Sequence, residues 1–212
     1  MAALDTHEQE QIEAIKAWWN DNRRWLLGIF LVAALSMAGW RSWQYYQNNQ
    51  AQEAETLFQQ FSEQMGSGDA KRVSDAAAAL MDKFPSTVYA TRAALMAALV
   101  SEETKNAESA KKQLHWIIEH ATEETMKDVA HLRLAAIFLD EKNFADALMH
   151  LDAKHTASFD GLYADLKGDV LSAQGQSDSA RSAYKLAFEK IDAQSPYRNL
   201  IQIKLDALGV AK

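Results

Sequence analysis

The hydrophobic pattern of the chain changes near the N-terminus, where one unbroken apolar run lies among mixed polar and apolar positions. Sixteen uncharged residues separate Arg24 from Arg41. As an α-helix they would extend about 24 Å, slightly less than the roughly 30 Å hydrocarbon core of a bilayer. The run predicts a membrane anchor made of Trp25, Leu26, Leu27, Gly28, Ile29, Phe30, Leu31, Val32, Ala33, Ala34, Leu35, Ser36, Met37, Ala38, Gly39 and Trp40.

Both ends of this run carry residues that settle at membrane interfaces. Tryptophans cluster before it, and Trp40, Trp43, Tyr45 and Tyr46 lie at its far end. Amphipathic rings partition to the headgroup level, and the flanking arginines can extend their guanidinium groups to the same depth. A buried core helix of a soluble protein would need neither feature, so the pattern favours contact with membrane lipid.

A cleaved export signal is the alternative to a permanent anchor, because Ser36-Met37-Ala38 weakly matches a cleavage site. Signal peptides begin with a short basic segment, whereas the segment before this run is long and net acidic. We therefore expect the anchor to be retained. The predicted division is residues 1–24 with a short amphipathic helix, residues 25–46 across the membrane and its interface, and residues 47–212 as a repeat domain.

Basic residues predict the orientation of the anchor. Lys16, Arg23 and Arg24 precede it, and Arg41 follows it. Because cytoplasmic flanks carry an excess of Lys and Arg, we expect a cytoplasmic N-terminus. In a bacterium this arrangement is a single-pass inner-membrane protein whose C-terminal domain is periplasmic.

Shorter patterns around the anchor leave two alternatives open. Ile12, Ile15 and Trp19 form one apolar stripe, which suits a helix on the membrane surface or a helix docked on a membrane partner. Ala34 and Ala38 match the small-x₃-small pattern of packed membrane helices, although a span that simply sits in lipid explains them equally well.

The rest of the chain reads as helices that repeat. The segments LRLAAIFLDEKNFADALMHLDAK (132–154) and DLKGDVLSAQGQSDSARSAYKLAFEK (165–190) align with an offset of 33 residues. The offset pairs Ala135 with Gly168, Phe138 with Leu171, Ala147 with Ala180, Leu151 with Tyr184, and the turn Lys142-Asn143 with Gly175-Gln176. Small residues opposite large ones permit closely crossing helices, and the spacing is that of the tetratricopeptide repeat. A plain helical bundle is the alternative.

Two weaker copies precede this pair, and one helix follows it. One copy has Ala98 and a polar turn at Lys105-Asn106, and the other has a turn at Gly66-Ser67-Gly68 and ends at Pro85. After Ser195-Pro196, the residues Tyr197, Leu200, Leu205 and Leu208 predict a capping helix that carries Arg198 and Lys204 outside its apolar stripe. The predicted fold is all-α: one transmembrane helix, then a tetratricopeptide-repeat-like solenoid of about four hairpins and a C-terminal capping helix.

Composition and motifs exclude several kinds of binding and catalytic site. The net charge of −7 argues against nucleic acid, and the absence of cysteine removes disulfides and thiolate chemistry. The histidine pairs His115/His120 and His150/His155 are five residues apart and point to different helix faces, so no metal site is predicted. Because no nucleophile or phosphate-binding motif occurs either, we expect neither an enzyme nor a bound cofactor.

Repeat stacks of this type usually bind protein segments on the concave face, which the first helices of the hairpins line. The repeat register predicts an apolar strip with an acidic edge there, suited to partly unfolded or basic chains. The alternative is that about half of these positions only complete the core. The predicted residues are Arg92, Leu95, Leu99, Glu102, Leu132, Ala136, Leu139, Asp140, Asp165 and Asp169.

The order of EQIEAIKAWW, an anchor that ends GWRSWQYY, and hairpins that close with ADLKGDVLSAQGQSDSARSAY resembles the YfgM family, the ancillary SecYEG translocon subunits of Gram-negative bacteria. The resemblance covers essentially the whole chain and implies an anchored periplasmic repeat domain. It further implies association with SecYEG and with a membrane-anchored periplasmic chaperone of the peptidyl-prolyl isomerase type, as a non-enzymatic adaptor that assists newly translocated proteins. A scaffold of a cell-wall or division complex, a regulatory adaptor of envelope stress signalling, and pairing with a second copy remain open.

Overall fold

The structure is a computed structural model that describes residues 6–66 and 69–210. Within these residues it contains nine α-helices and one short 3-10 helix, and no strand. The all-α prediction is therefore confirmed. Contacts divide the chain into two compact units, of which the first ends at Gln50 and the second begins at Ala51.

Helix α1 runs without interruption from Thr6 to Met65. Among the described residues it is the one helix that is long and apolar enough to cross a bilayer, and its apolar window is fully exposed. The short amphipathic helix expected within residues 1–24 is not a separate element. The reason is local, because no glycine or proline occurs between Thr6 and Leu27 to end a helix there.

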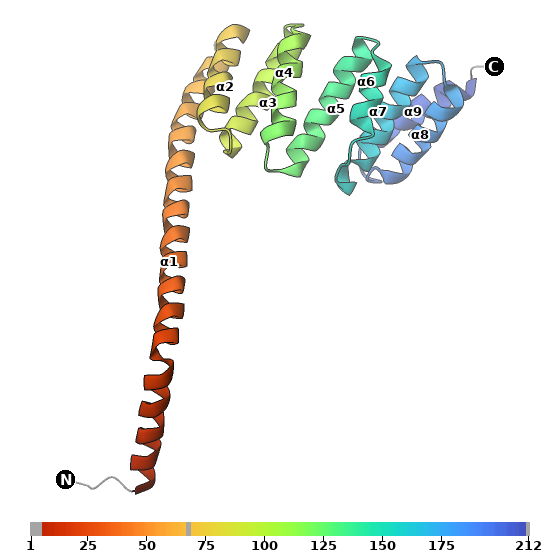
Figure 1. Cartoon of the computed structure of the whole chain (residues 1–212). Coiled ribbons are helices and arrows are strands. Elements are labelled where there is room, and N and C mark those ends of the chain that lie inside the picture. Colours follow the sequence, from red (N-terminus) through yellow and green to blue (C-terminus); the bar gives the residue numbers. More distant parts are fainter. Residues whose placement is uncertain (1–5, 67–68, 211–212) are drawn as a thin grey trace. The chain divides into compact units, whose positions relative to one another are not determined.

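The second unit is a succession of helical hairpins. Its helices are α2 (Ala70–Lys83), α3 (Val88–Glu103), α4 (Ala107–His120), α5 (Glu124–Asp140), α6 (Phe144–Leu151), α7 (Asp160–Ala173), α8 (Ser177–Lys190) and α9 (Tyr197–Val210), with a 3-10 turn at Ala157–Phe159. The end of α1 and α2 form the first hairpin, and α3/α4, α5/α6 and α7/α8 form the next three (Figure 1). Helix α9 packs on α8 at the end of the series.

The predicted small-large register is what holds the last hairpin together. A Cβ added to Gly168 would lie 2.4 Å from the Tyr184 ring, so α7 and α8 cross closely only because position 168 has no side chain. The corresponding residues one repeat earlier, Ala135 and Leu151, belong to one buried cluster. The 33-residue offset therefore reports real helix crossings.

Hairpin turns share one backbone feature. Lys105 and Lys142 have φ of 59° and 58°, and Gly175 has φ of 76°. In each turn the next residue precedes the second helix, and Asn106 and Asn143 cap that helix by accepting a hydrogen bond from a backbone N–H. The three predicted turns are confirmed. Of the fourth, at Gly66-Ser67-Gly68, residues 67–68 lie outside the described part of the chain.

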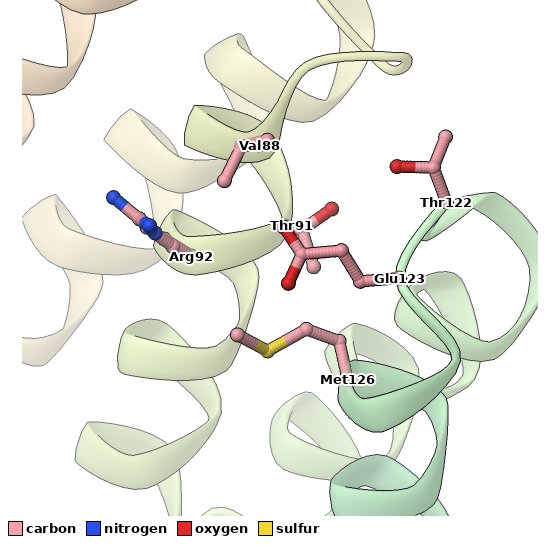
Figure 2. A pocket seen from close by; sticks show the side chains of 6 residues that line it. All are labelled: Val88, Thr91, Arg92, Thr122, Glu123 and Met126. Atoms are coloured by element: carbon pink, nitrogen blue, oxygen red, sulfur yellow. The ribbon is translucent and has the colours of Figure 1, made fainter.

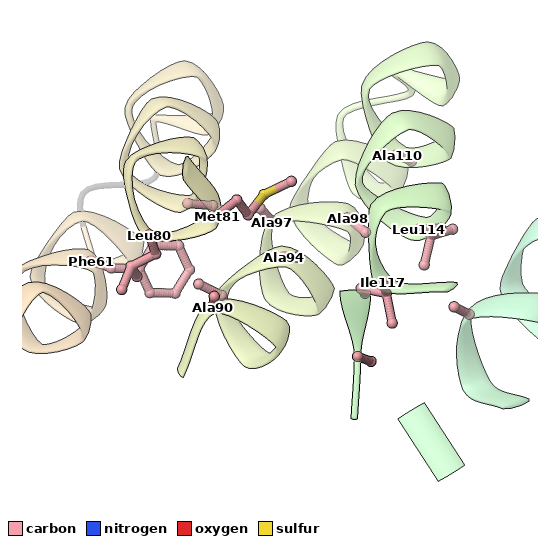
Figure 3. Close-up of a cluster of buried hydrophobic side chains, with 14 of the residues drawn as sticks. Phe61, Leu80, Met81, Ala90, Ala94, Ala97, Ala98, Ala110, Leu114 and Ile117 are labelled. Carbon is pink, nitrogen blue, oxygen red and sulfur yellow. The ribbon is translucent and has the colours of Figure 1, made fainter. Parts of the chain in front are cut away.

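The core follows the hairpins as three consecutive clusters. The largest joins the end of α1 to α2, α3, α4 and α5, and Figure 3 shows Phe61, Leu80 and Ile117 among its fully buried side chains. Alanines fill much of α3, where Ala90, Ala94 and their neighbours let α2 and α4 approach closely.

The capping helix agrees with the prediction at Leu205 and Leu208 and differs at the start of the apolar stripe. Ile201, Leu205 and Leu208 face the core, whereas Tyr197 and Leu200 are exposed. Lys204 was expected off the buried stripe, yet it lies against α7 and α8. The expectation was wrong because Ile201, the residue that is fully buried, was not counted in the stripe.

Candidate functional site: the face between α3 and α5

Two depressions lie along α3 and α5, one at the N-terminal ends of these helices and the other at their C-terminal ends. Figure 2 shows the first, a crease too narrow for a water molecule, with its lining side chains Val88, Thr91, Arg92, Thr122, Glu123 and Met126. The second, which we call the α3–α5 hollow, has a volume of about 270 Å³. Its lining is Glu102, Lys105, Ala107, Ala136, Ile137, Asp140 and Glu141.

The α3–α5 hollow is wide enough for one or two side chains of a bound segment. Ala107, Ala136 and Ile137 give it an apolar floor, and the charged residues rise from helix ends around it. Such a surface recognises a chain by burying an apolar side chain and offering polar groups at the rim.

An ion pair joins the two helices beneath this rim. Arg133 of α5 donates to Glu102 of α3 at 3.2 Å. Glu102 Oε1 and Arg133 Nε are buried and have no hydrogen-bond partner among the described residues. Burial raises the pKa of Glu102, against the lowering effect of Arg133, and the nearby charge of Asp140 adds to the rise.

Four of the predicted partner-binding residues line these depressions. Arg92 borders the crease, and Glu102, Ala136 and Asp140 border the α3–α5 hollow. In Figure 2 the Arg92 guanidinium points away from Glu123, which leaves it available at the surface.

Four others are leucines that serve packing to differing extents. Leu95 packs against the first core cluster, and Leu132 and Leu139 pack against the second. Leu99 is half-buried. The alternative that part of the strip completes the core therefore holds for these leucines.

The two remaining residues, Asp165 and Asp169, are engaged inside the fold. Asp165 is 4% exposed and accepts hydrogen bonds from Lys204 Nζ at 2.8 and 2.9 Å. Asp169 accepts from Lys204 at 2.8 Å and from the Tyr184 hydroxyl at 2.7 Å. The acidic edge predicted on α7 therefore holds the capping helix in place and offers little charge to a partner.

Burial raises the pKa of Asp165, against the lowering effect of the Lys204 ammonium. Burial disfavours the charge of Lys204, yet its hydrogen bonds to both carboxylates outweigh this and raise its pKa. Removing either partner would leave a buried charge without compensation.

A second hollow of about 450 Å³ lies between the end of the third hairpin and the fourth hairpin. Leu151, Ala164 and Leu186 form its apolar part. Its charged rim is already paired, because Lys167 contacts Asp152 at 2.6 Å and Lys190 contacts Asp160 at 3.0 Å. It offers a partner fewer free polar groups than the α3–α5 hollow.

Comparison with known proteins shows the family of the chain. A family profile described as a tetratricopeptide repeat-like domain matches residues 16–210. The chain belongs to this tetratricopeptide repeat-like family. No solved structure matches the chain.

Curated relatives share nearly its full length. A protein of Neisseria gonorrhoeae is 29% identical over 97% of this chain and 99% of its own length. Proteins of Aggregatibacter actinomycetemcomitans (27%; 97% and 100%) and Escherichia coli (28%; 96% and 98%) are similar over the same extent. Each is named an ancillary SecYEG translocon subunit, and these relatives confirm the resemblance to the YfgM family.

One group in this repeat-like domain was not found from the sequence. His115, His131 and His150 come from α4, α5 and α6 and meet at one point. Spacing within single helices could not reveal this contact. A usable signal existed, because His150 lies between Ala147 and Leu151 on the buried side of α6. Among the described residues, no group of three His, Cys, Asp or Glu side chains is arranged to hold a metal ion.

Proposed function

We propose that the protein is a non-enzymatic, membrane-anchored adaptor of the SecYEG translocon whose helical repeats bind other proteins. The names of the relatives, which match over nearly their whole length, are the observation that carries this proposal. The exposed apolar window of α1 supports a single-pass inner-membrane anchor. The repeat fold supports a role in protein binding.

The proposal places the N-terminus in the cytoplasm and the repeat domain in the periplasm. Lys16, Arg23 and Arg24 before the apolar run, against Arg41 after it, support this orientation. A phosphatase reporter fused to the C-terminus should be active only if that end lies outside the cytoplasm. Activity of a reporter that works only inside the cell would contradict the orientation.

The binding surface in this proposal is the crease and the α3–α5 hollow together. Extended segments of newly translocated proteins expose apolar side chains next to charged ones. Ala136 and Ile137 can receive the apolar side chains, while Arg92 and Asp140 offer opposite charges to polar groups of the segment. From this surface the adaptor passes the segment to a membrane-anchored periplasmic chaperone of the peptidyl-prolyl isomerase type.

A pull-down from detergent-solubilised membranes tests the two parts of the molecule separately. The full-length chain is compared with a version that lacks residues 1–50, the first compact unit. We expect the full-length chain to recover the translocon and the shortened chain to lose it. Equal recovery with both versions would contradict the role of the anchor.

A substitution pair tests the surface in the full-length chain. Ala136→Glu places a carboxylate on the floor of the α3–α5 hollow, and Lys185→Glu is the matched control on the exposed side of α8. We expect Ala136→Glu to lose translocated clients while the translocon is retained. Loss of the clients with Lys185→Glu alone would show that the binding surface does not lie at the α3–α5 hollow.

A further inference from the structure

Three histidines from three consecutive helices form a contact at the junction of the second and third hairpins. His131 Nδ1 of α5 lies 2.9 Å from His150 Nδ1 of α6. The ring of His115 from α4 is 5.7 Å from that of His150, measured between centroids. The ring of Phe138 stacks on the ring of His150, with 5.6 Å between the centroids and an angle of 9° between the planes.

The short distance requires that the two rings together carry a single proton between the facing nitrogens. One Nδ1 must donate and the other must accept, so the accepting ring is neutral in this contact. His150 is 5% exposed, and its Nε2 is buried without a partner among the described residues. A bare acceptor there costs less than an unsatisfied N–H, which favours His150 Nδ1 as the donor to His131.

A second proton on this pair breaks the contact. It would place two N–H groups against each other at 2.9 Å and leave a positive charge on a half-buried ring that has no acceptor in front of it. His150 has almost no access to water that could screen this charge. One ring must then leave, and His150 lies on the buried side of α6 together with Ala147 and Leu151.

We propose that the His115–His131–His150 contact is a pH-responsive latch that keeps α6 closed on α4 and α5 when neutral and releases it when protonated. The latch stands apart from the proposed function, because it concerns the opening of α6 and not the binding of a partner. Helix α5 carries His131 and also Ala136 and Asp140, which line the α3–α5 hollow. Opening of the third hairpin would therefore also change the shape of this hollow.

The charged groups around the latch come from every helix packed on it. Helix α4 contributes His115 and Lys111, whose ammonium lies 5.4 Å from the ring of Phe138. Asp128 of α5 and Asp146 of α6 favour protonation of His131 and His150. On the side of α7 and its preceding loop, the titratable groups are Lys167, which pairs with Asp152, and His155, whose Nε2 lies 3.4 Å from Asp160.

Burial outweighs the two aspartates. It lowers the pKa of His131, and together with the neighbouring histidines it lowers the pKa of His150 from 6.5 to about 4. An open α6 therefore takes up a proton at a higher pH than the closed one. The stability of the closed state is greatest above about pH 6.5 and decreases as the pH falls towards 4. At pH 5 this displacement corresponds to a roughly 30-fold larger opening constant.

Hydrogen exchange of the full-length chain in detergent tests the latch. The opening constant of peptides from Phe144–Leu151 is measured between pH 7.5 and 5 and corrected for the intrinsic exchange rate. We expect a rise on the order of 30-fold for the wild type. His131→Gln and His150→Gln cannot be charged, and the double variant should remove most of the rise. His120→Gln, an exposed histidine of α4, is the matched control and should behave as the wild type.

Each outcome decides the proposal. His131→Gln changes a half-buried position and guards against a variant that fails to fold, since it still offers His150 an acceptor. A wild type whose α6 does not open on acidification would overturn the latch. So would a rise that persists in the double variant, or one that is equally large in α2 and α8.

Discussion

Gly168 carries the most specific packing prediction of the structure. In Gly168→Ala the new Cβ would lie 2.4, 2.5 and 2.9 Å from three ring atoms of Tyr184. The ring cannot easily turn away, because Tyr184 is 3% exposed and its hydroxyl is fixed on Asp169 at 2.7 Å. The substitution must therefore separate α7 from α8 or displace the ring.

The cost follows from three contributions. Overpacking costs about 1–3 kcal/mol. Loss of a hydrogen bond to a charged carboxylate costs about 1.5–3 kcal/mol. The better helix propensity of alanine returns about 1 kcal/mol. The free energy of unfolding should fall by between about 1.5 and 5 kcal/mol.

Urea denaturation followed by circular dichroism measures this loss in the full-length chain in mild detergent. Gly209→Ala in α9 is the matched control, since a Cβ there meets nothing within 4 Å. In a Tyr184→Ala background the cost of Gly168→Ala should vanish, because the clash is with that ring. A loss within about 0.5 kcal/mol of the control, or an equal loss in both backgrounds, would refute the packing argument.

Three further predictions concern single contacts of the repeat domain. Lys142→Gly should raise the free energy of unfolding by about 0.5–1 kcal/mol, because Lys142 has φ of 58°, and urea denaturation would reveal it; no gain would mean that the turn is unstrained. Lys204→Met leaves the Asp165 carboxylate buried and unpaired and should cost about 3–5 kcal/mol, with Lys185→Met as the exposed control. Asp128→Ala removes the acceptor of the Thr156 N–H and hydroxyl, so proteolysis should begin in the loop after α6; unchanged cleavage would contradict that role.

Much of the repeat domain could be predicted because its evidence is local and repeated. The pairing of Gly168 with Tyr184 and the turns at Lys142 and Gly175 follow from one spacing of 33 residues. Close crossings demand a small residue opposite a large one wherever they occur, so the pattern carries through consecutive hairpins.

The capping helix and its ion pairs escaped prediction for a different reason. Leu200 and Ile201 are neighbours in sequence, and only contact with α8 decides which of them is buried. An error of one residue turned Lys204 outwards and left Asp165 without its partner 39 residues away. Long-range ion pairs depend on rotations that helical periodicity does not determine.

The candidate surface was predicted only in part, because packing against the neighbouring helix again decides which residues are buried. Ala136 and Asp140 line the α3–α5 hollow as the repeat register indicated, whereas Leu132 and Leu139 turn to the core. Residues on the edge of a helix face can serve either side, and the neighbouring helix decides. The histidine latch joins three helices and leaves no periodic trace in any of them.

Site-specific photocrosslinking in intact membranes tests the central claim most directly. A photoreactive residue at position 136 is compared with one at position 185 on the exposed side of α8. The account predicts that position 136 captures chains in transit through SecYEG, and that position 185 does not. Capture from position 185 with none from position 136 would contradict the assignment of the α3–α5 face as the binding surface.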